Sequence, residues 1–356
     1  MKEATTMVVV GADVHTRTHT FVAVDQVGKQ LGQLTVEATT KGHFRAIGWA
    51  REQFGEELTW AIEDCRHLSA RLERDLLTAG QPVVRVPPKM MAQVRASART
   101  RGKSDPIDAL AVARALLREP GPPVACHDEA SRELKLLVDR RESLVATRTR
   151  TINSLLWRVH ELDPERAPKP RSLDLAKHQD VLRDWLQALP GIVAELAMDE
   201  LADVVDLTRR EKVLQKRIAV LAERAAPSLV AMPGCGPLTA AKLVGESAGI
   251  TRFKSEAAFA RHAGVAPIPV LSGNTAGRVR TTRSGNRQLN AALHRIAITQ
   301  IRLTDSLGQT YYAKKKAEGM SNREALRCLK RRLARIVFHH LTTDQATTAT
   351  CAAAAA

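Results

Sequence analysis

The chain has 356 residues, of which 44% are apolar, enough to supply the cores of two or three domains. Lysines and arginines total 54 against 38 acids, and the net charge of +16 indicates a polyanionic partner such as nucleic acid. No apolar run reaches the ~18 residues of a membrane span and no signal-peptide pattern precedes the first strand, so we expect a cytoplasmic, nucleoid-associated protein without a membrane partner. Five scattered cysteines and 3% aromatic residues argue against a disulfide framework, a zinc site and recognition by aromatic base stacking.

The first third of the chain has the pattern of a mixed sheet covered by helices. Strand-like segments separated by short polar turns predict an antiparallel meander, at 7–13, 21–25 and 31–38. Helices and strands then alternate, with helices over 42–54, about 67–79 and 89–98 and strands over 58–64 and 82–86. We therefore expect residues 7–122 to form an α/β domain with the element order of a ribonuclease-H-like fold.

Residues 128–226 are predicted to be helical. Apolar positions recur among many arginines over 131–160, and a second helical pattern covers about 180–225 after a proline-rich break. Two long helices joined by a polar loop indicate an antiparallel pair, which would form a coiled-coil arm or a dimerisation element. The alternative is that both helices pack against the first domain.

Residues 227–342 are expected to form a helical C-terminal domain. Its opening segment, MPGCGPLTAAKLVGES at 232–247, has the glycine pattern of a helix-hairpin-helix. In that motif Gly234 and Gly236 would let backbone N–H groups approach a phosphate at a helix N-terminus. The pattern favours DNA binding without sequence preference.

Most of the positive charge lies near the C-terminus. From Thr251 to His340 there are 18 lysines and arginines against 4 acids, a net charge of +14. Lys314, Lys315 and Lys316 are candidate phosphate contacts, with a solvated helix face as the alternative. The low-complexity end of the chain, 343–356, is predicted to be a disordered tail.

Two acids at strand ends are candidates for a metal site. Asp13 shares a strand face with apolar neighbours, where a carboxylate is costly unless it is paired or metal-bound. Asp25 ends the next strand and competes with it, although a turn explains that acid equally well. At the end of the fourth strand, alternation directs either Glu63 or Asp64 inward, and we favour Glu63.

The motif KSDPIDA, 103–109, adds two more acids at the start of a helix. Asp105 and Asp108 are three residues apart and therefore share one helical face. A helix start alone would also explain them, because Asp105 before proline is a common N-cap and Asp108 complements the helix dipole. Four acids would suffice to hold divalent cations for phosphoryl transfer, with Mg²⁺ or Mn²⁺ as the expected cofactor.

A serine in the basic C-terminal region is a candidate nucleophile. Ser272 precedes a glycine in a loop that is rich in arginine, and nearby guanidinium groups would stabilise charge that develops on a phosphate. Most Ser-Gly pairs are simply turns, and Ser284 has the same dipeptide. The arginines that we expect to contact nucleic acid are Arg278, Arg280, Arg283 and Arg287.

Two sets of motifs, in this order along the chain, resemble the insertion-sequence-110 family of DEDD transposases. GADVHTRTHTFVAVD, AIED and KSDPIDA are similar to the RuvC-like domain of that family. MPGCGPLTAAKLVGE, FARHAGVAPIPVLSG and RSGNRQLNAAL are similar to its C-terminal transposase domain. The resemblance maps the four family acids onto Asp13, Glu63, Asp105 and Asp108, and the family serine onto Ser272.

The resemblance implies a site-specific DNA recombinase that moves its own insertion element. It implies a serine that becomes covalently attached to cleaved double-stranded DNA, and a structured noncoding bridge RNA that recognises target and donor. It also implies a homo-oligomer, from dimer to tetramer, in which the acids of one subunit face the serine of another. The alternative function is a RuvC-like, structure-selective endonuclease, a junction resolvase that would need the acids but no serine.

Overall fold

The computed structural model describes residues 7–63, 68–86, 90–91, 94, 104–118, 124–125, 128–271, 274, 279–281 and 285–354. The chain divides into two compact units. The first unit comprises residues 1–128 with 251–258, and the second comprises 129–250 with 259–356. The predicted arm and C-terminal domain thus belong to one unit, and their finer boundaries stay a prediction.

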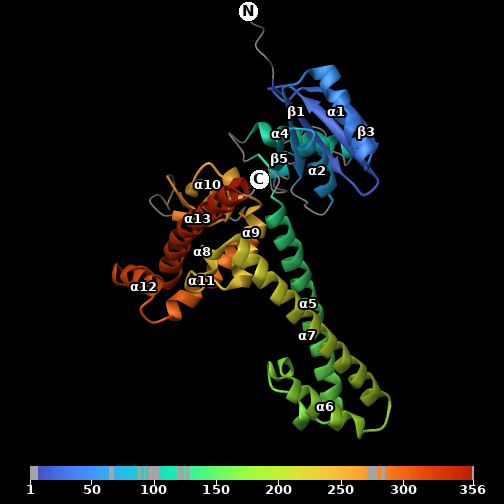
Figure 1. Ribbon diagram of the computed structural model, residues 1–356, viewed down its shortest axis with the longest axis vertical. Coiled ribbons are helices and arrows are strands. Elements are labelled where there is room, and N and C mark those ends of the chain that lie inside the picture. Colours follow the sequence, from blue (N-terminus) through green and yellow to red (C-terminus); the bar gives the residue numbers. More distant parts are fainter. Residues whose placement is uncertain are drawn as a thin grey trace, which may run out of the picture. The chain divides into compact units, whose positions relative to one another are not determined.

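The first unit is built on a five-stranded mixed sheet (Figure 1). Its strands are β1 (Val8–Val14), β2 (Thr18–Val24), β3 (Gln30–Glu37), β4 (Leu58–Glu63) and β5 (Val83–Val86). The spatial order is β3-β2-β1-β4-β5, in which β1, β2 and β3 form the antiparallel meander and β4 and β5 run parallel to β1. This topology confirms the predicted ribonuclease-H-like fold.

Helices cover both faces of this sheet because its inner strands are apolar on both faces. The helices of the first unit are α1 (Thr40–Phe54), α2 (Ala70–Thr78) and α4 (Asp105–Leu117). Strand alternation separates two cores: Val10 and Trp60 pack with residues of α1 and α2, whereas Val9 and Ala61 pack with residues of α4. The sheet is therefore the middle layer of three.

Gly11 allows α4 to lie directly on β1. A Cβ atom at this position would come within 2.2 Å of the Ala109 carbonyl oxygen and 2.6 Å of the Ala113 nitrogen. No other residue could occupy the site without moving the helix. The close contact fixes α4 on the strand that carries Asp13.

His19 makes the first unit sensitive to acid. Its ring is buried and stacks on His43 with 5.0 Å between ring centroids, while His43 Nδ1 lies 2.7 Å from an Asp75 oxygen. Burial, and then the neighbouring His43, lower the pKa of His19 from 6.5 to about 4. The folded state thus disfavours the charged form of His19. The free energy of unfolding therefore falls as the pH drops below the pKa that His19 has in the unfolded chain.

We expect the free energy of unfolding to decrease by about 3 kcal/mol between pH 7 and pH 4 through His19 alone. The unfolded chain binds a proton at His19 from about pH 6.5 downwards, whereas the folded chain resists protonation until about pH 4. Urea denaturation at several pH values measures the slope, and His19→Gln should flatten it. An equal slope in both proteins would contradict the assignment.

The second unit begins with a long antiparallel helix pair, α5 (Glu129–Leu162) and α7 (Ile192–Ala225). Ion pairs fix its register, because Arg217 bonds to Glu133 near one end and Arg158 bonds to Glu200 towards the other. Helix α6 (Ala176–Gln187) packs at the far end of the pair (Figure 1). The antiparallel pair was predicted from sequence.

The second predicted helix, over about 180–225, is wrong in one respect. It is divided into α6 and α7, which are separated at Pro190 and Gly191. Proline disfavours a helical conformation in the residue before it, and Gly191 has a φ of 98°, a value that glycine adopts readily.

The rest of the second unit consists of further helices and a small hairpin. Its elements are α8 (Pro227–Val230), α9 (Pro237–Ser247), α10 (Glu256–His262), β6 (Pro267–Pro269), β7 (Val279–Thr281), α11 (Arg287–Arg302), α12 (Leu307–Ala317) and α13 (Asn322–Ala354), and α10 begins in the segment grouped with the first unit. Helix α13 continues through Ala354, where a disordered tail had been predicted from residue 343. The alanines and the buried Asp344, which accepts a hydrogen bond from Ser228, favour the helix.

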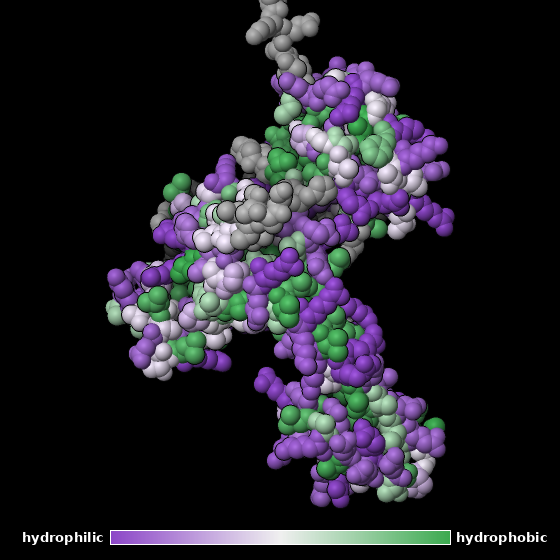
Figure 2. Space-filling view, viewed as in Figure 1, coloured by the Kyte–Doolittle hydropathy of each residue, from purple (hydrophilic) through white to green (hydrophobic). Residues whose placement is uncertain are grey.

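No helix among the described residues is long and apolar enough to cross a membrane. On the face shown in Figure 2, hydrophilic side chains cover most of the surface and apolar ones lie between them in small groups. Such scattered apolar residues are normal for a protein surface.

Candidate functional site

Asp13 and Glu63 lie at the ends of two adjacent parallel strands. Ala12 of β1 pairs with Ile62 of β4, so Asp13 and Glu63 follow next in register. Because Val9 and Ala61 face α4, alternation places both acids on the α4 side of the sheet. The preference for Glu63 over its neighbour agrees with this register, and Asp64 lies outside the described residues.

Helix α4 brings Asp105 and Asp108 to the same side. The helix begins at Asp105 and its N-cap residue is Ser104, so Asp105 is not the capping residue. Asp108 is buried in the first turn, whereas about half of the Asp105 side chain is exposed. The contact at Gly11 sets this helix start against the end of β1.

His15 contacts two of the four acids. Its Nε2 atom lies 3.0 Å from Asp13 Oδ2 and 3.5 Å from Asp105 Oδ1. Among the described residues, one ligand atom from each of Asp13, His15 and Asp105 lies within 4.8 Å of the others, close enough to share a metal ion. Glu63 and Asp108 lie outside that group.

Sequence reasoning missed His15 as a site residue. The available signal was its position two residues after Asp13, which places both side chains on one face as the chain leaves the strand. The competing acid is excluded on structural grounds, since Asp25 Oδ1 accepts hydrogen bonds from the backbone N–H groups of Val27 and Lys29. Asp25 is therefore a turn residue, which was the alternative interpretation of this acid in the sequence.

The site accumulates negative charge around a buried carboxylate. Burial raises the pKa of Asp13, and the charges of Asp108 and Asp105 raise it further, while His15 opposes the shift. A bound cation would remove this penalty, because it neutralises carboxylates that otherwise repel one another. Carboxylate oxygens with one imidazole nitrogen fit a divalent cation.

The structure places only part of the predicted nucleic-acid surface. Ser272, Ser284, Arg278 and Arg283 lie outside the described residues, and so does the side chain of Arg280. Arg287 is described: it is the first residue of α11 and is exposed to solvent. Because Ser272 lies outside the described residues, its pairing with the acids stays a prediction.

The lysine run at the end of α12 divides into two kinds of residue. Lys314 and Lys316 are exposed, whereas Lys315 lies 2.6 Å from a Glu318 oxygen and over the ring of Tyr311. Within this run, Lys314 and Lys316 can therefore bind a polyanion directly, whereas Lys315 would first have to break its contacts with Glu318 and Tyr311.

The two glycines of the predicted helix-hairpin-helix have different roles. Gly234 has a φ of 81°, and a Cβ atom there would lie 3.3 Å from atoms of α11, so packing and backbone conformation explain this glycine. Gly236 is the exposed N-cap of α9, and a Cβ atom there would meet nothing within 4 Å. Space at Gly236 is thus open to an outside group.

Comparison with known families gives two matches along the chain. Residues 10–161 match the DEDD family of IS110, which is described as a transposase. Residues 226–313 match a second family, described as the transposase IS116/IS110/IS902 family. The first match contains all four acids, and the second contains Ser272.

Two relatives resemble the chain over most of its length. An uncharacterized 42 kDa protein of insertion element IS900 from Mycobacterium paratuberculosis is 28% identical, over 80% of this chain and 82% of that protein. An uncharacterized 44.8 kDa protein of insertion element IS116 from Streptomyces clavuligerus is also 28% identical, over 91% and 92%. Among solved structures, RuvC from T. thermophilus in complex with a Holliday junction substrate aligns with 31% of this chain and 91% of its own, at 17% identity and a TM-score of 0.24.

Proposed function

This chain belongs to the IS110 family of transposases, and from that premise we propose that it excises and inserts its element through a metal-bound acid site and a serine nucleophile. The observation that carries the proposal is the convergence of Asp13, His15 and Asp105 at the end of β1. The carboxylates gathered there repel one another, and a bound cation would neutralise that repulsion.

The role proposed for the acids in phosphoryl transfer is to hold a divalent cation. Asp13 and Asp105 would hold the ion, and Glu63 and Asp108 would complete the set from the neighbouring strand and helix turn. His15 fixes the Asp13 carboxylate through its hydrogen bond. A divalent cation, Mg²⁺ or Mn²⁺, would stabilise the charge that develops on the phosphate oxygens.

Ser272 would perform the covalent step. Its Oγ atom attacks the scissile phosphorus, the bond from phosphorus to the leaving DNA oxygen breaks, and that oxygen takes up a proton as the serine loses one. A hydroxyl of another DNA strand then attacks the phosphoserine, and Ser272 leaves with a proton. The two transfers conserve the number of phosphodiester bonds, so rejoining needs no nucleotide hydrolysis.

Double-stranded DNA and a structured noncoding RNA from the element are the proposed partners. The charge of +14 between Thr251 and His340 supports binding of both polyanions. A homo-oligomer, from dimer to tetramer, would pair the acids of one protomer with the serine of another.

The proposal is tested with the purified protein and the nucleic acid that copurifies with it. Labelled DNA containing the joined element ends should give a protein–DNA adduct that survives denaturant with Mg²⁺ and does not form with EDTA. Metal-dependent cleavage without any adduct would replace the proposal by a structure-selective endonuclease. Sequencing of the copurified RNA should reveal one discrete RNA encoded beside the gene, and a random RNA mixture would reject guidance.

Replacing Lys314 and Lys316 together by alanine should weaken DNA binding and its dependence on salt. The slope of log K against log salt is negative, and each lost phosphate contact reduces its magnitude by about 0.9, so we expect the magnitude to fall by roughly 2. Binding titrations between low and moderate salt measure the slope. The matched control is Lys169→Ala with Lys177→Ala, two exposed lysines of the same unit; an equal decrease there would show a general charge effect.

A further inference from the structure

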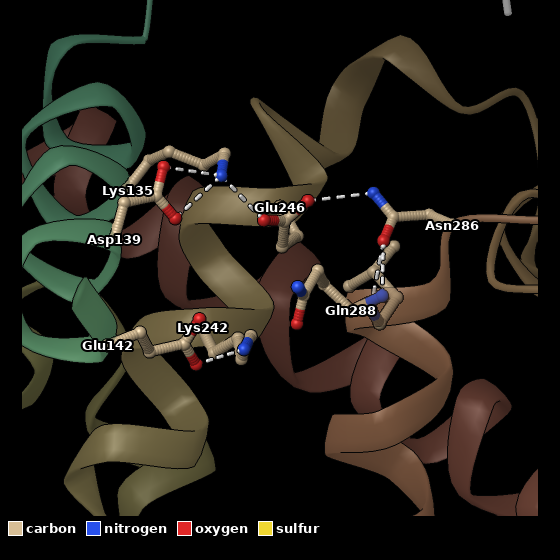
Figure 3. Close-up of polar contacts among 8 residues, drawn as sticks. Lys135, Asp139, Glu142, Lys242, Glu246, Asn286 and Gln288 are labelled. Carbon is tan, nitrogen blue, oxygen red and sulfur yellow. Dashed lines mark hydrogen bonds and ion pairs between the residues drawn. The ribbon is translucent and has the colours of Figure 1, made fainter. Parts of the chain in front are cut away.

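A partly buried network of charged side chains joins helices α5 and α9. At Gly245 of α9 a Cβ atom would lie 2.9 Å from the Lys135 backbone of α5, so the helices touch closely. The Lys135 ammonium lies 2.7 Å from an Asp139 oxygen and 2.8 Å from Glu246 Oε1 (Figure 3). Only 6% of the Glu246 side chain is exposed, and the Lys135 ammonium compensates its buried charge.

Glu246 extends this network to the start of α11. Its Oε2 atom accepts a hydrogen bond of 2.7 Å from Asn286 Nδ2 (Figure 3). Asn286 Oδ1 caps α11 by accepting from the backbone N–H groups of Gln288 and Leu289. The Asn286 backbone N–H donates to the His262 carbonyl oxygen at 2.6 Å. One asparagine therefore joins α9, α10 and α11.

A second set of contacts lies beside Asn286. A Cβ atom at Gly285 would come within 2.3 Å of Gly264, so the two backbones are in direct contact. Asn290 Nδ2 donates to the carbonyl oxygens of Ala263 and Gly264, both at 3.1 Å, and Lys330 donates to Asn290 Oδ1. Residues 262–264 and 285–286 are thus fixed to each other.

The segment between these two ends contains the β6–β7 hairpin. Pro267 pairs with Thr281 and Pro269 with Val279, and the side chains of β6 are exposed. A two-stranded ribbon without a core of its own is marginally stable in water. Its direction is therefore set mainly by the residues at its root. Ser272 lies in the connection between the two strands.

We infer that Lys135, Glu246 and Asn286 form a positioning clamp, which fixes the direction of the β6–β7 hairpin and so presents the loop that carries Ser272. The inference rests on the proposed role of Ser272. An apolar pair would pack two helices as well as a buried ion pair does, but hydrogen bonds with fixed geometry specify one arrangement. A displacement of about 1 Å at a reacting atom can greatly lower the reaction rate. A clamp that prevents such a displacement would therefore increase the rate of the covalent step.

The chain contains a matched control for the clamp. Lys242 of α9 and Glu142 of α5 form a second ion pair between the same two helices, visible in Figure 3. Lys242 is buried, so this pair also compensates a desolvated charge. Among the described residues it makes no hydrogen bond to the root of the hairpin.

The test exchanges donor and acceptor at the clamp. Asn286→Asp retains the cap of α11 but places a second carboxylate against Glu246, whereas Glu246→Gln in the same protein restores a donor and an acceptor. In the full-length protein we expect Asn286→Asp to raise hydrogen exchange at the backbone amides of Ile268 and Arg280, which face each other across the hairpin, at least tenfold. It should slow formation of the DNA adduct at least tenfold while DNA affinity changes less than twofold. The double variant should recover most of both losses.

Glu142→Gln should lower the melting temperature without changing hairpin exchange or the rate of adduct formation. The clamp is rejected if Asn286→Asp leaves hairpin exchange unchanged, or if Glu142→Gln raises it as much. The positioning role is rejected if exchange rises but the adduct forms at the normal rate. If the unsubstituted protein forms no serine adduct, the proposed function is rejected. The hydrogen-exchange measurements on the hairpin then test the clamp independently of that function.

Discussion

Ser272→Ala is expected to abolish the covalent protein–DNA adduct and strand exchange, with a loss on the order of ten-thousandfold or more. Alanine removes the only atom of this side chain that can attack phosphorus. DNA binding should persist, because the substitution leaves unchanged the arginines and lysines that we expect to contact phosphate. The adduct is measured on denaturing gels with labelled DNA, and binding is measured separately by titration.

Ser284→Ala is the control for this substitution. Ser284 has the same Ser-Gly dipeptide and lies in the same arginine-rich region, so a change there tests whether any serine of the region suffices. We expect the Ser284→Ala protein to form the adduct at nearly the normal rate. An adduct that survives Ser272→Ala and disappears in Ser284→Ala would reverse the assignment, and cleavage that survives both would indicate a nuclease.

Asp13→Asn is expected to lower DNA cleavage by on the order of a thousandfold, or about 4 kcal/mol of transition-state stabilisation. Asparagine has the shape of aspartate but lacks the charge that a divalent cation requires. The metal-free variant should be at least as stable as the unsubstituted protein, because burial and the neighbouring acids already raise the pKa of Asp13. Added Mn²⁺ should raise the melting temperature of the unsubstituted protein but not that of the variant.

The same substitution at Asp25 is the control. Asp25 ends the neighbouring strand but accepts backbone hydrogen bonds in a turn, so Asp25→Asn should lose some stability and retain cleavage and the response to Mn²⁺. A catalytic role for Asp13 would be refuted if Asp13→Asn cleaved DNA at the normal rate in Mg²⁺. Loss of cleavage accompanied by a large loss of stability would indicate a structural carboxylate instead.

The elements of the first unit follow from local patterns. Apolar runs and short polar turns predicted the meander, and alternation predicted that Glu63 shares the face of Ala61. The broken helix at Pro190 was missed because a long amphipathic pattern continues on both sides of it. The helical tail was missed because low complexity indicated disorder, although alanine strongly favours a helix.

The sequence by itself predicted the element order of the sheet domain, the antiparallel helix pair and the four candidate acids. These depend on periodicity and spacing, which are properties of neighbouring residues. Only the tertiary structure showed that His15 lies 3.5 Å from Asp105 and that Glu246 joins Lys135 to Asn286. Those contacts join residues whose approach depends on how helices and strands pack, and no local pattern encodes a contact between segments that are distant in the chain.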